Sequence, residues 1–289
     1  MIRIPSTFKT GIMSKDNKPA AYCKSGDTVI FETLDCFDGA VSKDGYYDKE
    51  GEYIANPVTG PLYVEGAEPG DALEVEILAI RTRGWGAMGT GYGEFAFKNY
   101  DDKNRICVFD YSDGFVKLGG HKIPVEPMIG VIGVAPAGEG IPTTTPDKHG
   151  SNMDCNRIIE GAVISFPVQV EGGLLAMGDM HALMGDGEVF SYGLETGGEA
   201  EVRVKVVKNA GLLQPTIRQG GKVMTVGSAL TYEDAIRLAL EAMYELLKAH
   251  GWEKTEAGLL MSMKCNLAIC QIVDPQVTVR AELSEEFFK

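Results

Sequence analysis

The sequence predicts a mainly β protein, with an antiparallel, sandwich-like body and an α+β portion at the C-terminus. Residues 72–80 and 201–206 alternate apolar and charged side chains with a period of two, whereas residues 231–250 repeat apolar side chains at helical spacing. We therefore expect a β-rich body over residues 1–210 and an α+β portion over residues 211–289. No linker rich in Ser or Pro divides the two portions, so they can also form one integrated unit.

The β-rich body is expected to contain several half-buried strands. In residues 72–80, Leu73, Val75 and Ile77 alternate with Glu74 and Glu76. This pattern is typical of a strand with one packed face and one wetted face, as in antiparallel sheets. Turn dipeptides rich in Gly separate further candidate strands, which are residues 28–32, 106–111, 162–170 and 174–181.

The C-terminal portion is expected to begin with an amphipathic helix over residues 231–250. Thr231 with Asp234 resembles a capping box at its start, and Gly251 follows its end as a stop signal. A second helix is expected at about residues 254–265. Two strands, residues 268–273 and 276–281, would then complete the chain.

The charge balance excludes several classes of partner. The chain has 289 residues, 27 Lys plus Arg against 41 Asp plus Glu, and a net charge of −14. Such a chain repels nucleic-acid phosphates and anionic lipid headgroups, so we expect neither nucleic acid nor a membrane as partner. No apolar run approaches the ~20 residues that span a bilayer. The six cysteines form no C-x-x-C pair, and no signal peptide is visible, which indicates reduced thiols in a cytoplasmic protein.

The densest polar cluster lies between His149 and Glu195. Asp179 and His181 are spaced i, i+2 in an expected strand, so both side chains project from the same face. Because the neighbouring residues are apolar, the carboxylate is expected to be buried and to need a charge partner. A divalent cation would supply one: imidazole with carboxylates suits Zn²⁺, whereas carboxylates and carbonyls alone would suit Ca²⁺.

Other acids are candidates with ordinary alternatives. His149, Asn152 and Asp154 share a loop that can bend ligands toward one point, although Asx turns and a surface imidazole would also explain it. Asp38 is a further candidate ligand or simply part of an Asp-Gly turn. In the Asp186-Gly187-Glu188 tripeptide, one carboxylate would be a ligand and the other a base, unless the tripeptide is a solvated turn. Glu126, between two prolines, is either a rigidly held base or a surface acid.

Two other features receive less weight. Residues 84–89 match G-x-G-x-x-G, but Gly91 and Gly93 follow where a nucleotide-binding fold needs a helix. We therefore interpret the segment as a mobile Gly-rich loop and a candidate lid near the pocket. Cys36 and Cys155 each lie beside an acid, which disfavours the thiolate and makes both poor nucleophiles.

In these motifs the sequence resembles the acetamidase/formamidase family over nearly its whole length. The matching stretches are residues 66–71, 127–136, the HGSNMD loop 149–154, 178–181, 185–188 and 270–274. The resemblance implies a mainly β fold with an α+β portion, homo-oligomerisation, and hydrolysis of short-chain amides at a site lined by acids and His. One departure is Ser151, where many relatives are expected to have Gly; Ser suits most turns unless the position requires a positive φ.

We therefore expect a cytoplasmic, metal-dependent hydrolase that converts a small neutral amide to a carboxylate and ammonia. The expected metal ligands are His181, Asp179 and His149, with Asp38 and Asp154 completing one or two sites. Glu188 is the expected base, with Glu195 behind it, and Asn152 would donate a hydrogen bond to the developing oxyanion. Met180, Met184 and the Gly-rich loop would wall a small pocket. The alternatives are a non-catalytic β-protein holding a structural divalent cation, or a cysteine-dependent amidase using Cys155 or Cys36.

Overall fold

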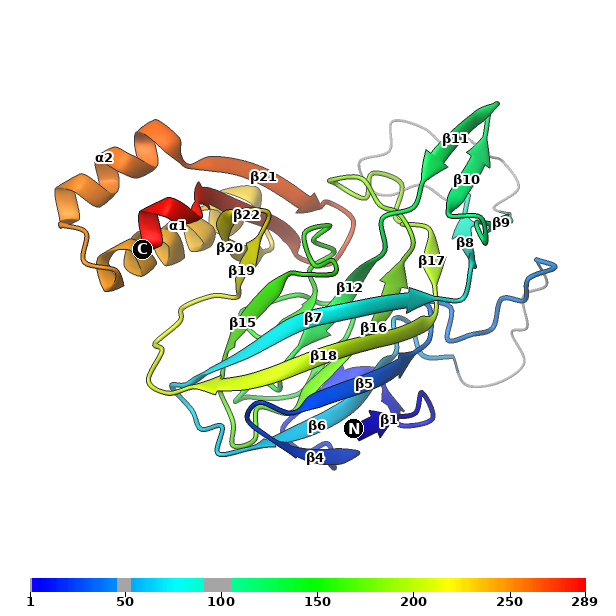
Figure 1. Ribbon diagram of the computed structural model, residues 1–289, viewed down its shortest axis with the longest axis horizontal. Coiled ribbons are helices and arrows are strands. Elements are labelled where there is room, and N and C mark those ends of the chain that lie inside the picture. Colours follow the sequence, from blue (N-terminus) through cyan, green and yellow to red (C-terminus); the bar gives the residue numbers. More distant parts are fainter. Residues whose placement is uncertain (1, 46–52, 91–104) are drawn as a thin grey trace.

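Two large β-sheets face each other in this protein, and two helices lie at one end (Figure 1). The computed structural model describes residues 2–45, 53–90 and 105–289. Within them, most strand pairs are antiparallel; β1 with β5 and β4 with β6 are the parallel exceptions. The predicted mainly β class, with an α+β C-terminal portion, is confirmed.

The first sheet has nine strands and runs from the N-terminal strand to the C-terminal portion. Its order is β1 (Ile2–Ile4), β5 (Thr28–Thr33), β18 (Gly198–Val207), β7 (Ala72–Thr82), β15 (Val163–Pro167), β19 (Thr216–Gln219), β20 (Lys222–Ala229), β22 (Val277–Ser284) and β21 (Asn266–Gln271). The pairing of β15 with β19 carries this sheet past residue 210. The division of the chain into folding units at that residue stays a prediction.

The second sheet carries most of the polar cluster. Its main path is β14 (Gly150–Asn152), β12 (Met128–Gly133), β16 (Leu175–His181), β17 (Glu195–Thr196), β8 (Trp85–Gly89) and β9 (Ile106–Asp110), and β6 (Val58–Glu65) joins β16, β2 (Lys9–Thr10) and β4 (Ala21–Lys24). Two small ribbons add β10 (Phe115–Leu118) with β11 (His121–Pro124), and β3 (Ile12–Met13) with β13 (Ile141–Pro142). Residues 85–89 are therefore a paired strand rather than a loop, while Gly91 and Gly93 lie outside the described residues.

The main hydrophobic core fills the space between the sheets. Phe31, Leu73 and Val202 of the first sheet share one buried cluster with Ile129 and Met177 of the second. Each such side chain contributes roughly 1.5–3 kcal/mol on burial. Every residue of β16 is buried, so this strand runs through the interior and brings its polar C-terminal end, Asp179 to His181, into an apolar environment.

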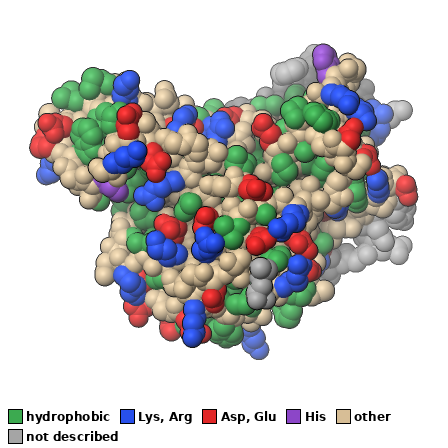
Figure 2. Space-filling view, viewed as in Figure 1, with side chains coloured by type: hydrophobic (Ala, Val, Ile, Leu, Met, Phe, Trp, Pro, Cys, Tyr) green, Lys and Arg blue, Asp and Glu red, His purple; other side chains and the backbone are tan. Residues whose placement is uncertain are grey.

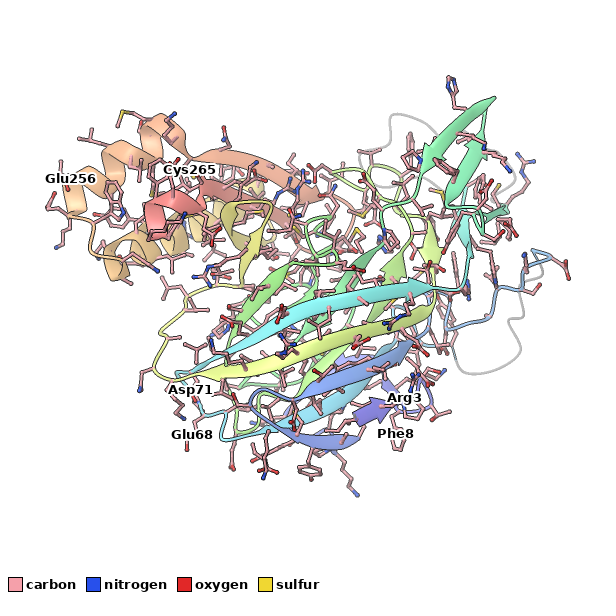
Figure 3. All side chains as sticks on the ribbon, viewed as in Figure 1. Arg3, Phe8, Glu68, Asp71, Glu256 and Cys265 are labelled. Carbon is pink, nitrogen blue, oxygen red and sulfur yellow. The ribbon has the colours of Figure 1, made fainter. Side chains whose placement is uncertain are left out.

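The outer face of the first sheet is charged, as the period-two alternation predicts. Arg203 of β18 pairs with Glu76 of β7 at 2.7 Å, and Arg81 pairs with Glu201 at 2.8 Å. In the space-filling view, basic and acidic side chains intermingle over β7 and β18 (Figure 2). At the start of β7, Asp71 lies beside Glu68 and accepts a hydrogen bond from Lys208 at 2.8 Å (Figure 3). The pairs of Arg203 with Glu76 and of Arg81 with Glu201 lie at the surface and contribute little stability, so the sheet depends mainly on its buried face.

The C-terminal helices cover the end of the first sheet. Helix α1 (Tyr232–Ala249) begins at Thr231, whose side chain accepts a hydrogen bond from the Asp234 amide, which confirms the predicted cap. It packs on β20 and β22, so closely that a Cβ on Gly227 would lie 2.3 Å from the Ala235 carbonyl oxygen. Helix α2 (Lys254–Lys264) follows, and a 3₁₀ helix (Glu285–Phe288) ends the chain. Among the described residues, no helix has the length and apolarity needed to cross a membrane.

Candidate active site

The candidate site forms where β16 and β17 of the second sheet meet four connecting segments, which contribute Cys36, Asp154, Glu188 and Asp274. His181 and Asp179, spaced i, i+2 on β16, do approach each other, with 3.7 Å between His181 Nε2 and Asp179 Oδ1. The same ring nitrogen lies 3.7 Å from Asp154 Oδ1 and 3.3 Å from Glu195 Oε2. One buried imidazole therefore faces three buried carboxylates from three different segments.

The cluster extends to Glu188 and Cys36. Donor atoms of Asp154, His181 and Glu188 lie within 4.8 Å of one another, and those of Cys36, Asp179 and Glu195 form a second group of the same size. Glu188 Oε1 accepts a hydrogen bond from the Gly193 amide at 2.9 Å. The site is thus a dense set of acids around one imidazole, with a thiol at its edge.

Burial perturbs three acids of this set, Asp154, Glu188 and Glu195, in the same direction. Desolvation raises the pKa of Asp154 to about 6 and that of Glu195 to about 8, and raises the pKa of Glu188 well above its usual range. The neighbouring carboxylates add to this rise, whereas the charge of His181 opposes it. For His181, burial lowers the pKa, but Glu195 and Asp179 outweigh it and raise the pKa well above its ordinary value. The carboxylates therefore need positive charge nearby to remain ionised.

Several oxygen and nitrogen atoms of the cluster that could bind a metal lack hydrogen-bonding partners within the described part of the chain. These buried atoms are both carboxylate oxygens of Asp154, Oδ1 of Asp179, Nδ1 of His181 and Oε2 of Glu195. Buried polar atoms are nearly always paired in folded proteins, and an unpaired one has a large desolvation cost. The orphaned atoms point to a bound group that would satisfy them.

A relay of amides and carboxylates borders the acids. The Nδ2 group of Asn56 donates to Asp179 Oδ2 at 2.8 Å and to Asn152 Oδ1 at 3.3 Å. Asn152 Nδ2 in turn donates to Asp274 Oδ2 at 2.8 Å. Neither Asn56 nor Asp274 is among the residues that the sequence motifs single out for the site. Asp274 ends the family-like run 270–274, which is a signal that could have found it, whereas nothing in the sequence around Asn56 marks it.

Left-handed backbone conformations concentrate at this site. Five of its lining residues, Asn56, Asp154, Asp179, Glu188 and Ser191, have φ between 41° and 71°. The left-handed backbone conformation is unfavourable in free energy for a residue other than Gly. Such residues cluster where the surrounding structure fixes a functional geometry. The strained residues here are mostly the ones that present polar groups to the cavity.

Ser151 takes the conformation that favours glycine, with φ of 78°. The departure from the family's expected Gly is therefore not minor, because this position does require a positive φ. The hydroxyl of Ser151 donates to the Thr143 carbonyl at 2.9 Å within the buried interior. That hydrogen bond gives Ser a role that Gly lacks.

Three of the predicted site residues, two acids and one imidazole, lie outside the cluster around His181. Asp38 forms an ion pair with Lys9 and accepts a hydrogen bond from the Ile54 amide at 3.4 Å. Asp186 forms a bidentate ion pair with Arg280, at 2.7 and 2.8 Å. His149 is fully buried beside β12 and β14, and neither ring nitrogen has a partner among the described residues.

The fourth candidate residue outside the cluster is Glu126, which is exposed. Its backbone amide donates to the Ala182 carbonyl at 2.9 Å, but its side chain is not part of the cavity wall. The surface-acid interpretation of Glu126 therefore fits its position better than that of a rigidly held base.

The acids surround a cavity of about 180 Å³. Its lining residues are Cys36, Phe37, Tyr53, Asn56, Asn152, Asp154, Asp179, Glu188, Ser191, Tyr192, Glu195 and Asp274. Met180 is instead in the hydrophobic core, and Met184 lines a neighbouring apolar cavity. Aromatic side chains therefore take the place expected for methionines and for the Gly-rich segment.

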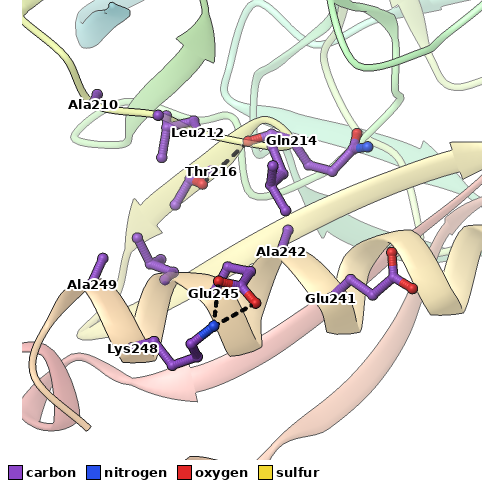
Figure 4. Close-up of a pocket in the computed structure, with 12 residues that line it drawn as sticks. Ala210, Leu212, Gln214, Thr216, Glu241, Ala242, Glu245, Lys248 and Ala249 are labelled. Carbon is purple, nitrogen blue, oxygen red and sulfur yellow. Dashed lines mark hydrogen bonds and ion pairs between the residues drawn. The ribbon is translucent and has the colours of Figure 1, made fainter. Parts of the chain in front are cut away.

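A larger cavity of about 640 Å³ lies between α1 and residues 210–216 (Figure 4). Its charged side chains are Glu241, Glu245 and Lys248, and Lys248 pairs with Glu245 at 2.8 Å. It contains no group of acids and imidazoles comparable with the cluster around His181. The acidic cavity is therefore the candidate site because of its chemistry, although it is the smaller of the two.

The two cysteines considered as nucleophiles differ in position. Cys36 lines the acidic cavity, where burial and then the charges of Glu195 and Asp179 raise the pKa of its thiol well above the usual value. Cys155 lies outside the cavity lining and contacts Cys270 in the interior. A hydrogen bond with Cys270 and the charge of Arg280 lower the pKa of the Cys155 thiol, contrary to the expectation from its neighbouring acid, but this thiol is buried outside the cavity wall. Cys36 lies at the cavity but lacks the electropositive surroundings typical of a reactive cysteine.

Comparisons with known proteins agree with this architecture. The acetamidase of Bacillus halodurans is 38% identical, with a TM-score of 0.91 and coverage of 99% of this chain and 98% of that chain. A predicted acetamidase/formamidase of Thermoanaerobacter tengcongensis is 40% identical, with a TM-score of 0.93 and coverage of 99% and 96%. The formamidase of Methylophilus methylotrophus is 25% identical over 251 residues, which are 65% of this chain and 61% of that protein. The chain thus spans less than two thirds of the length of the curated relatives it matches.

The sequence profile of the Acetamidase/Formamidase family matches residues 13–139 and 137–289. These two ranges together include the HGSNMD loop, β16 and the 270–274 run on which the resemblance rests. The prediction of family membership is confirmed, and this chain belongs to the acetamidase/formamidase family.

Proposed function

We propose that this protein hydrolyses short-chain amides of the formamide and acetamide type to a carboxylate and ammonia, with the help of a divalent cation. The observation that carries the proposal is the set of three buried carboxylates facing one ring nitrogen of His181 at 3.3 to 3.7 Å. Family membership and the names of the relatives, formamidase and acetamidase, support the substrate class. The cavity of about 180 Å³ also suits a small substrate.

The donor set at the cavity fits a divalent cation. Orphaned oxygens of Asp154 and Asp179 lie close to His181, and imidazole with carboxylate oxygens suits Zn²⁺ or a similar ion. We propose His181, Asp154 and Asp179 as its ligands; a Ca²⁺ ion on the oxygen-rich side near Asp274 is a second possibility to measure. When bound, a cation of this kind polarises a carbonyl oxygen and lowers the pKa of water.

The remaining acids would handle protons. Glu188 is held by the Gly193 amide through one carboxylate oxygen, so its other oxygen is available as a base toward water. Glu195 lies on the neighbouring strand as a second proton acceptor. After attack on the carbonyl carbon, the protonated base returns the proton to the leaving nitrogen, because an amide anion is too basic to depart unprotonated.

Asn152 is suited to orient the substrate. Its Nδ2 group has two hydrogens, of which one is donated to Asp274 Oδ2. The second hydrogen is then available to the carbonyl oxygen of an amide, where negative charge develops during attack. The surrounding acids would repel a carboxylate substrate, which favours a neutral amide and aids release of the acid product.

The direct test is ammonia release from formamide and acetamide, together with elemental analysis of the protein. We expect turnover and bound metal in the wild type, and loss of both after chelation and in His181→Ala. His121→Ala is the matched control, because His121 is exposed on the β10–β11 hairpin. Undiminished turnover in His181→Ala would remove the proposed site. A stabilising metal without amidase activity would favour a structural cation in a non-catalytic protein.

A cysteine-dependent mechanism is the second candidate, because Cys36 lies beside Asp179 and Glu195 in the cavity. Cys36→Ala separates the two mechanisms. Retention of most of the activity is expected for the metal-dependent reaction, whereas a loss equal to that of His181→Ala, with the metal still bound, would support a covalent thiol intermediate. Cys155→Ala is the control variant for a buried thiol outside the cavity.

We further propose a cytoplasmic location and a homo-oligomeric state. All six cysteines are free, in line with a reducing compartment. The edge strand β21 exposes Leu267 and Ile269, and the adjacent helix α2 exposes Leu259 and Met263. Residues 257–273 contain Lys264 as their one charged side chain, so this is a surface where two acidic copies could meet without repulsion. Sedimentation equilibrium would measure the oligomeric state directly.

A further inference from the structure

We propose that Arg280 is a positioning residue that fixes Glu188 in the active cavity by anchoring the segment 185–188 to the C-terminal strands. This inference rests on the proposed function of Glu188 as the base. It gives the α+β portion a second part in the site besides Asp274, although Arg280 itself does not line the cavity.

Arg280 is the largest of the fully buried side chains, with 1% exposure. Its two terminal nitrogens donate to the two oxygens of Asp186 at 2.7 and 2.8 Å, and its Nε donates to Glu282 Oε1 at 2.7 Å. Nη1 also donates to the Ile269 carbonyl at 3.2 Å. A buried guanidinium with a bidentate carboxylate is both strong and directional, so the position of Asp186 is closely fixed.

Backbone hydrogen bonds extend the anchor to the next residue. The Gly187 amide donates to the Cys270 carbonyl at 2.8 Å, and the Ile272 amide donates to the Gly187 carbonyl at 3.1 Å. Residues 186 and 187 are therefore both attached to the end of β21 and its partner strand. Glu188 follows immediately, with φ of 46°, and turns its carboxylate into the cavity.

The anchor is needed because the backbone of residues 185–188 is intrinsically flexible and because neighbouring carboxylates repel Glu188. Gly185 and Gly187 flank Asp186, and glycine restricts the backbone less than any other residue. Inside the cavity, the like charges of Asp154, Glu195 and Asp274 repel an ionised Glu188, and His181 is the attracting partner on this side. From outside the cavity, the bidentate ion pair between Arg280 and Asp186 opposes the displacement of Glu188 that this repulsion favours.

The same strand end also holds Asp274. The side-chain oxygen of Gln271 accepts hydrogen bonds from the amides of Val273 and Asp274 at 2.8 and 3.0 Å. Gln271 Nε2 donates to the Thr278 hydroxyl at 3.0 Å on β22. Two acids of the cavity, Glu188 and Asp274, are thus positioned from the C-terminal strands, which makes Arg280 part of a shared support.

The structure offers a matched pair of variants for the test. Asp186→Asn and Glu282→Gln each remove one carboxylate partner of the same buried guanidinium, but only Asp186 belongs to the segment that carries Glu188. We expect similar losses of melting temperature in the two variants. We expect kcat to fall by about tenfold to a hundredfold in Asp186→Asn with little change in KM, and to stay within about twofold in Glu282→Gln, since small displacements of a reacting group have effects of this size.

A second readout does not depend on activity. Hydrogen exchange of the peptide containing residues 183–194 should accelerate in Asp186→Asn and in Arg280→Lys, because the ammonium of Lys cannot form the bidentate ion pair that a guanidinium forms. Exchange of the same peptide should be unchanged in Glu282→Gln. Equal effects of Asp186→Asn and Glu282→Gln on kcat and on exchange would overturn the inference. If the wild type lacks amidase activity, the proposed function fails, and the exchange experiment still decides whether Arg280 anchors the segment.

Discussion

His181 Nε2 lies 3.3 Å from Glu195 Oε2, and the two residues are direct cross-strand partners on β16 and β17. The imidazole has little room to turn, because a Cβ on Gly193 would lie 2.4 Å from its Nδ1. The strand pairing therefore fixes His181 beside Glu195 at the centre of the site, and the missing side chain of Gly193 allows the backbone to pack against the imidazole.

The first prediction concerns Gly130, on β12 beneath the cluster. A Cβ there would lie 2.5 Å from Asp154 Oδ1 and 2.8 Å from the Asp179 carbonyl oxygen, so the acids must shift. We expect Gly130→Ala to lower kcat by about a hundredfold and to cost roughly 1–3 kcal/mol of unfolding free energy. Ammonia release and denaturant titration measure the two effects.

The control for this prediction is Gly138→Ala. A Cβ at Gly138 meets no atom within 4 Å, and its backbone is outside the left-handed region. Full activity is expected in this variant. Normal kcat in Gly130→Ala would contradict the close packing of the acids around Gly130.

The second prediction separates backbone strain from hydrogen bonding at Ser151. Ser151→Ala keeps the strain of a φ of 78° and loses the hydrogen bond to the Thr143 carbonyl. We therefore expect the free energy of unfolding to fall by roughly 1–3 kcal/mol. Ser151→Gly loses the same bond but relieves the strain, which is worth about 1–2 kcal/mol. The Gly variant should therefore melt at a higher temperature than the Ala variant, and the reverse order would show that the strain is unimportant.

The third prediction concerns the pH dependence that His149 confers on stability. Burial lowers its pKa to about 4 in the folded protein, against an ordinary value of 6.5, so between these pH values the unfolded chain binds more protons than the folded one. The contribution of neutral His149 to the free energy of unfolding is therefore fully present above pH 6.5. It falls by roughly 3 kcal/mol as the pH drops to 4.

His149→Leu removes this dependence and the two unpartnered ring nitrogens. Denaturant titrations at pH 7 and pH 4.5 should show that the variant loses less stability on acidification than the wild type does. Its metal content should match that of the wild type, because His149 does not join the cluster around His181. A variant without metal would restore His149 to the ligand set, where the sequence places it.

Local patterns in the sequence were sufficient for both helices and for several of the longer strands, but not for β6, β12 or β20. The alternation over residues 72–80 predicted β7, and the Thr231–Asp234 pair predicted the start of α1, because both depend on interactions within a few residues. Segment 84–89 was misread as a loop, since its glycines serve close packing of β8 on Glu195 rather than flexibility. The i, i+2 spacing also correctly brought Asp179 and His181 together.

The membership of the site was decided by tertiary structure. Asp274 reaches Asn152 across 122 residues, and Asn56 reaches Asp179 across 123, whereas Asp38 and Asp186 pair with Lys9 and Arg280 instead. The sequence by itself determined which faces of the strands are buried and that acids and imidazoles occur near their ends, because these depend on short-range periodicity and composition. Which acids share one cavity depends on strand register and on packing between distant segments, and no local pattern encodes either.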